Sequence, residues 1–168
     1  FIDALQVCER AVALYVRIGD PAALSQARVR LSRLHYLAGN TGQAQIVARQ
    51  AVEQHEPNAC GMTNLGAVLA LSGDPGASRT LAWAQELAVR SGRTDLIELC
   101  LNYQSIAQPG LSPDERITLL RQSLDLALRH GHNEHAARGY TNLAELLYLQ
   151  GRFDELRICV SDGLIFTH

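Results

Sequence analysis

The hydrophobic positions near the C-terminal end of the chain follow a helical period. Apolar residues recur three or four positions apart on both sides of Gly151, as in Leu143 and Leu147, then Leu156 and Val160. This spacing places the side chains on one face of an α-helix. Gly151 between the two runs suits the left-handed backbone that ends many helices. The segment therefore predicts two helices joined by a very short turn.

The same pattern recurs along the chain with a period of 34 residues, the spacing that separates Leu31, Leu65 and Leu99. Turn signals recur in step with it. In one of them, Asp74 is expected to cap the following helix and Pro75 to occupy its first position. The pattern predicts about nine helices and no strand, near residues 2–18, 21–38, 41–55, 58–72, 75–91, 93–107, 113–130, 133–149 and 152–167.

The period lengthens before the last repeat, because Leu99 and Leu143 lie 44 residues apart. Part of the excess is a loop at 108–113, which we expect to end with a Ser112 cap and Pro113 at the first helical position. The rest comes from a long helix that ends near residue 130.

These features resemble the tetratricopeptide repeat family, which packs two helices into each repeat of 34 residues. Small residues recur where the motif brings helices close together: Ser32, Gly66, Cys100 and Ala144. Tryptophan never fills the first motif position, so the repeat is degenerate.

The resemblance implies an all-α, TPR-like solenoid of helical hairpins that winds into a right-handed superhelix. We expect one domain over 1–168, with an orphan helix at 1–18 and repeats at about 21–56, 57–91, 93–130 and 132–168. The sequence starts without methionine, inside a helical pattern, so we expect it to be a fragment of a longer chain.

Composition favours helices and argues against several kinds of site. Hydrophobic residues make up 47% of the chain and aromatic residues only 5%, so alanine and leucine dominate. Every basic residue is an arginine, which excludes a P-loop lysine and a Schiff-base lysine. The net charge of -2 argues against direct contact with nucleic acid. We therefore predict no enzyme activity and no cofactor.

Four cysteines lie far apart, at Cys8, Cys60, Cys100 and Cys159, without metal-ligand spacing. They are expected to be buried thiols in a reducing cytoplasm. We find no signal peptide and no apolar run long enough for a membrane span.

The densest group of metal-ligating residue types is His130-Gly-His132-Asn-Glu-His135, at a predicted turn. Zinc needs ligands that converge from a rigid frame, and this string lacks a recognisable fourth ligand. We therefore expect polar turn residues and no metal site. Binding of a metal by these histidines stays the alternative.

In the family that this chain resembles, the first helix of each repeat lines a concave face that binds partners. The resemblance implies a partner-binding set of Gln26, Arg33, Tyr36, Asn64, Gln104, Arg138, Asn142, Glu145 and Tyr148. The expected partner is a protein or peptide, or else a small effector.

The segment 140–152 also resembles the repeat region of MalT-like, ATP-binding LuxR-type bacterial transcriptional regulators. That resemblance implies a non-catalytic binding scaffold with a sensing or assembly role. The ATPase and the DNA-binding helix-turn-helix of such regulators lie outside this sequence. The alternative is a stand-alone adaptor or a self-associating scaffold, for which we expect a homo-oligomer.

Overall fold

The computed structural model describes residues 2–53, 57–107 and 110–166, and within these ranges it contains nine helices and no strand. They are α1 (Ile2–Ile18), α2 (Pro21–Leu37), α3 (Thr41–Glu53), α4 (Ala59–Leu71), α5 (Ala77–Arg90), α6 (Thr94–Ala107), α7 (Pro113–His130), α8 (Asn133–Leu149) and α9 (Phe153–Phe166). The all-α fold class is therefore confirmed. The expected helical positions 54, 55 and 167 and the connector positions 108 and 109 lie outside the described residues.

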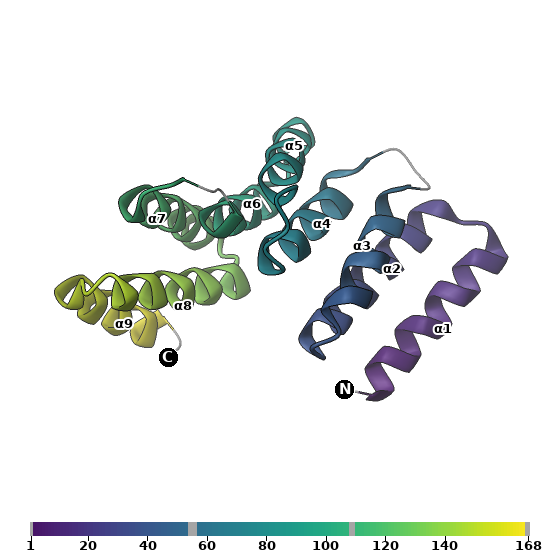
Figure 1. The fold of residues 1–168 in the computed structure, drawn as a ribbon, viewed down its shortest axis with the longest axis horizontal. Helices are drawn as coiled ribbons and strands as arrows, with labels where there is room; N and C mark the ends of the chain where they lie inside the picture. Colours follow the sequence, from purple (N-terminus) through teal and green to yellow (C-terminus); the bar gives the residue numbers. More distant parts are fainter. Residues whose placement is uncertain (1, 54–56, 108–109, 167–168) are drawn as a thin grey trace.

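Consecutive helices pack as hairpins along an arc that runs from α1 to α9 (Figure 1). Each first helix of a pair (α2, α4, α6, α8) packs on the second helix that follows it, and α1 packs on α2. The backbones of the first helices also lie close to one another in succession, whereas those of the described parts of α1, α3, α5, α7 and α9 stay farther apart from one another. Because helices on the inside of a curved array approach more closely, α2, α4, α6 and α8 form the concave side.

Local capping explains where several helices begin or end. Ser112 begins α7 with a capping box: its hydroxyl accepts a bond from the Glu115 backbone N–H, and the Glu115 carboxylate accepts one from the Ser112 backbone N–H. Gly151 has a φ of 68°, the left-handed conformation expected after α8.

The predicted helix start, with Asp74 as the cap and Pro75 as the first helical residue, is wrong by two residues. Helix α5 begins only at Ala77. The Asp74 carboxylate accepts a bond of 2.8 Å from the backbone N–H of Gly76, two residues on. An aspartate that bonds in this way closes a separate turn ahead of the helix.

Small residues allow the paired helices to approach closely, as expected. Gly66 of α4 faces Leu81 of α5, and a Cβ atom at Gly66 would lie 2.6 Å from Leu81 Cδ2. The fully buried Ser32 donates a hydrogen bond of 2.9 Å to the carbonyl oxygen of Ala44 on α3. These contacts confirm the predicted packing of the hairpins.

The core divides into two main hydrophobic clusters. One extends from α3 to α6 around Leu69 and Leu81. The other joins α7, α8 and α9 around Ile117 and Leu147. Neighbouring hairpins therefore share a core locally, as in other repeat arrays.

The prediction of four buried thiols holds for only two of the cysteines. Cys100 and Cys159 are buried, and burial raises the pKa of Cys100 to about 11. Cys8 and Cys60 are half-buried. Cys8 lies on α1, which among the described helices packs on α2 alone.

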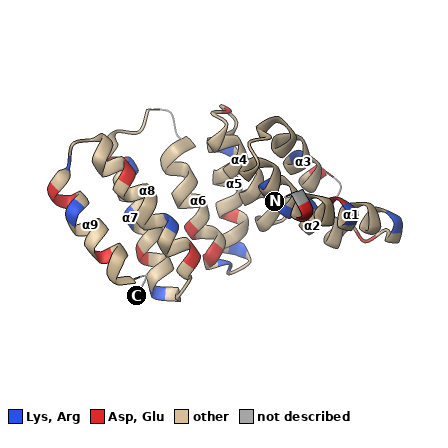
Figure 2. Cartoon of the chain, turned by 90° about the horizontal axis from the view of Figure 1, so that it is seen from below, with Lys and Arg blue, Asp and Glu red and all other residues tan. Residues whose placement is uncertain are grey.

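Charged residues of both signs are intermixed along the ribbon (Figure 2). Among the described residues, no helix combines the length and apolar character needed to cross a membrane.

Candidate functional site on the concave face

The first helices enclose a cavity of about 360 Å³, here called the central hollow. Its walls come from α2, α4, α6 and α8. Apolar and polar side chains both line it: Val29, Arg33, Tyr36, Leu37, Cys60, Thr63, Asn64, Ala67, Val68, Leu71, Leu96, Leu99, Tyr103 and Arg138. An apolar cavity with a few polar groups is the usual form of a binding site.

A second cavity of about 430 Å³, here called the distal hollow, continues the concave face toward α8. It shares Leu71, Tyr103 and Arg138 with the central hollow and adds Asn142 and Glu145. The two hollows therefore form one groove that is divided at Arg138.

Arg138 is held in place between the hollows. Its guanidinium donates 2.5 Å to the hydroxyl of Tyr103 on α6 and 2.8 Å to the carboxylate of Glu134 on α8. The guanidinium carbon also lies 6.0 Å from the centre of the Tyr103 ring. These contacts present a positioned cation to anything that occupies the groove.

Glu134 also links two helices that line the central hollow, α2 and α8. Its carboxylate accepts a bond of 2.5 Å from Arg33 on α2. This hydrogen bond, more than any other contact, holds the pKa of Glu134 below its ordinary value. Both side chains are more than half exposed, so the pair contributes only about 0.2–1 kcal/mol. A ligand carboxylate could therefore replace Glu134 as the partner of Arg33 at little cost.

Six of the nine residues that the resemblance implies for partner binding lie in this groove. Arg33, Tyr36, Asn64 and Arg138 line the central hollow, and Arg138, Asn142 and Glu145 line the distal hollow. Asn64 and Asn142 are anchored by side-chain hydrogen bonds within the concave layer, at 3.3 Å and 2.8 Å.

The other three residues lie elsewhere. Gln104 is buried and donates a bond of 2.8 Å to Gln85 on α5, so it faces its neighbouring second helix. The ring of Tyr148 packs edge-on to Phe153 of α9, 6.3 Å away. Gln26 lines a separate cavity between α1 and α2.

Two residues that shape the groove carry no sequence signal for that role. Tyr103 has the position of a packing residue in the repeat, and its ring is indeed buried. Its hydroxyl nevertheless reaches Arg138. Glu134 follows a turn, where acidic residues are common at helix starts, and only the curvature of the array brings Arg33 to it.

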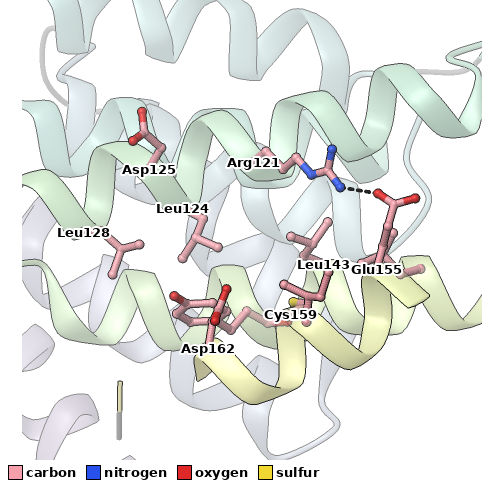
Figure 3. Close-up of a pocket in the computed structure, with 11 residues that line it drawn as sticks. Arg121, Leu124, Asp125, Leu128, Leu143, Glu155, Cys159 and Asp162 are labelled. Atoms are coloured by element: carbon pink, nitrogen blue, oxygen red, sulfur yellow. Dashed lines mark hydrogen bonds and ion pairs between the residues drawn. The ribbon is translucent and has the colours of Figure 1, made fainter. Parts of the chain in front are cut away.

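A third cavity, of about 310 Å³, lies on the outer side between α7 and α9, with α8 beneath it (Figure 3). Leu124 and Leu128 face Leu143 and Cys159 across it. An ion pair between Arg121 of α7 and Glu155 of α9 closes one end. None of the expected partner-binding residues lies here, and the cavity fits a gap between two second helices whose backbones do not come into contact.

The predicted turn histidines divide into two groups. His130 lies at the end of α7, as expected, and its Nδ1 is hydrogen-bonded to the carbonyl oxygen of Leu126 at 2.8 Å. His132 and His135 instead face the carboxylate of Glu98 on α6. Glu98 was not predicted, since nothing in the sequence relates it to histidines 34 and 37 residues away.

Comparison with known proteins finds one family match, to the tetratricopeptide repeat, over residues 137–155. These residues cover most of α8, the turn at Gly151 and the start of α9. A search of curated proteins finds no match. The family match supports a tetratricopeptide identity, and together with the helical hairpins it suggests a protein-binding scaffold. Folds of this kind are typically non-catalytic.

Proposed function

We propose that the chain is a non-catalytic scaffold that binds a segment of a partner protein in the concave groove, with the central hollow as the main contact. One observation carries the proposal: Arg33, Tyr36, Asn64 and Arg138 converge from three helices on a single cavity that apolar side chains also line. These residues are distant in the sequence, and packing of the repeats alone does not require their side chains to meet.

The chemistry of the hollow indicates what the partner segment presents. An apolar side chain fits against the apolar part of the lining, which includes Leu71 and Leu99. A carboxylate or a backbone carbonyl fits the rim, because guanidinium groups such as those of Arg33 and Arg138 donate paired hydrogen bonds to such acceptors. A small effector with an apolar body and a carboxylate would meet the same groups, and the cavity volume is within the range of small-molecule sites.

A displayed library of random 12-residue peptides tests the proposal without a known partner. We expect selected peptides to be enriched in an acidic residue near an apolar one. Tyr36→Ala should weaken their binding by about 30-fold, equivalent to about 2 kcal/mol for a buried aromatic contact.

Tyr148→Ala is the matched control, because Tyr148 is also a tyrosine on a first helix but contacts α9. It should change binding less than about threefold. Arg121→Ala tests the outer cavity in the same way. Equal effects of all three substitutions, or a loss confined to Arg121→Ala, would contradict binding in the groove.

For the wider context, we propose that the chain is the sensing or assembly segment of a larger bacterial transcriptional regulator in the cytoplasm, without DNA contacts of its own. The resemblance of the segment 140–152 and the mixed surface charge support this. The complete reading frame of the gene tests it: we expect a P-loop ATPase and a helix-turn-helix in the same chain. A frame without them would favour the stand-alone or self-associating adaptor.

A further inference from the structure

The carboxylate of Glu98 is fully buried and faces two histidine rings. Nδ1 of His132 lies 2.8 Å and 2.9 Å from the two carboxylate oxygens, and Nδ1 of His135 lies 2.9 Å from one of them. A buried carboxylate is costly unless it is paired with positive charge or bound to a metal. Two neutral imidazoles would supply hydrogen bonds and no charge.

The three side chains are held by a rigid frame. Glu98 lies on α6, and its backbone carbonyl accepts a bond of 2.8 Å from Ser123 on α7. His132 precedes α8 and His135 lies in its first turn. Their spacing of three residues puts both rings on one side of the helix start, facing α6.

We propose that Glu98, His132 and His135 form a binding site for a divalent transition-metal ion of the zinc class. The candidate ligand atoms, one from each residue, all lie within 4.8 Å of one another. Tetrahedral zinc with bonds of about 2.0–2.1 Å holds its ligand atoms about 3.3 Å apart. Each Nδ1 atom therefore needs to move about half an ångström away from the carboxylate oxygen that it faces. Binding requires an Nδ1 lone pair on each ring, so each neutral imidazole carries its proton on Nε2 in the bound state.

The donor set favours borderline metals over hard ones. Two imidazole nitrogens and one carboxylate suit Zn²⁺, Ni²⁺ or Cu²⁺, whereas Mg²⁺ and Ca²⁺ prefer oxygen ligands only. The side chain of His132 is 35% exposed, so water can reach the fourth coordination position from that side.

His130 is a neighbour of this site and not one of its ligands. Its Nδ1 is already bonded to the Leu126 carbonyl and lies 3.8 Å from the Glu98 carboxylate. Its ring stacks on that of His132 with centroids 5.9 Å apart. His130 therefore helps to orient His132.

A metal at this position would link α6 to α8, which belong to successive hairpins (Figure 1). Because the ligands converge only in the folded chain, the ion would stabilise the junction between the last two hairpins. The three proposed ligands line neither hollow, and neither proposal depends on the other.

Titration of the chelator-treated chain with Zn²⁺ in a calorimeter tests the site. We expect one ion per chain, and a loss of affinity of at least about 100-fold in both His132→Ala and His135→Ala. Co²⁺ should give visible d–d bands without the thiolate charge-transfer band that cysteine ligands would add. Mg²⁺ should not compete.

His130→Ala is the matched control, and it should weaken Zn²⁺ binding less than about tenfold. Glu98→Gln should abolish stoichiometric Zn²⁺ binding. Because this substitution is in a fully buried side chain and can prevent folding, the two histidine variants test the same site at more exposed positions. Zn²⁺ affinity unchanged in His132→Ala and His135→Ala would overturn the proposal and leave a hydrogen-bonded cluster. A thiolate band with Co²⁺ would also overturn it.

Discussion

At the scale of single residues, Gly66 sets the distance between α4 and α5. A Cβ atom at this position would lie 2.6 Å and 2.7 Å from two carbon atoms of Leu81, whose side chain is fully buried. We predict that Gly66→Ala lowers the free energy of unfolding by about 1–3 kcal/mol, because the packed leucine must shift. Urea unfolding followed by circular dichroism measures the change.

Gly42→Ala is the control for the same chemical change. Gly42 lies in the first turn of α3, and a Cβ atom there meets nothing within 4 Å. The substitution should be neutral or should stabilise the chain by up to about 1 kcal/mol, as alanine does in helices. Equal unfolding free energies in the two variants would show that α4 and α5 do not pack at Gly66.

Which side chains enter the groove was only partly predictable at this scale. The repeat register puts Arg33 and Tyr36 on the concave face, and both line the central hollow. Gln104 lines neither hollow, because one position of error on a helix rotates a side chain by about 100°. Its hydrogen bond to Gln85 depends on how α6 packs against α5. The buried Glu98 could not be found at all, since burial of a carboxylate is a property of tertiary packing.

At the scale of helices, the boundaries were largely predictable because caps are local. Ser112 and Gly151 act within a few residues of themselves. The predicted start of α5 was wrong because the side chain of Asp74 can bond to the backbone either as a helix cap or within a separate turn. The sequence alone does not decide between these two hydrogen bonds.

The capping box of α7 gives a prediction at this scale. Two hydrogen bonds from Ser112 lower the pKa of Glu115 from its ordinary 4.5. The bond from the Ser112 side chain has the larger effect, and the bond from its backbone N–H has the smaller one. A carboxyl group with a lowered pKa stabilises the fold above about pH 4.5, and this contribution is lost as the pH falls through the lower, folded-state pKa. Glu115→Gln should therefore be less stable than the parent at pH 7, with a difference that shrinks below pH 4.5.

Ser112→Ala should remove the cap itself and cost about 1 kcal/mol at pH 7. The control is Gln122→Ala, an exposed position in the middle of α7, which should change stability little. Thermal melts at pH 7 and pH 3.5 measure all three variants. A stability gap for Glu115→Gln that is the same at both pH values would exclude an ionised carboxylate in the cap.

At the scale of the whole molecule, the period of 34 residues predicted the stack of hairpins but not its curvature. Each repeat adds a small rotation, and the sum over several repeats brings Arg33 of α2 to Glu134 of α8. Such a long-range contact depends on angles that no single repeat specifies. The groove is therefore a property of the array, whereas its helices are properties of local sequence.

The division of the core predicts that the array does not unfold as one unit. Leu81 belongs to the cluster of α3 to α6, and Leu147 belongs to the cluster of α7 to α9. Both side chains are almost fully buried, so Leu81→Ala and Leu147→Ala should each cost about 2–5 kcal/mol. In repeat arrays the loss falls mainly on the hairpins that share the damaged core.

Hydrogen exchange of the backbone amides, read by mass spectrometry, distinguishes local from global unfolding. In Leu147→Ala we expect faster exchange in α8 and α9, while α4 and α5 keep the protection of the parent chain. Leu81→Ala should show the reverse pattern, which makes each variant the control for the other. This pattern requires the contacts between the two clusters to be weaker than those within them. Uniform acceleration across all helices in both variants would contradict this and indicate a single cooperative core.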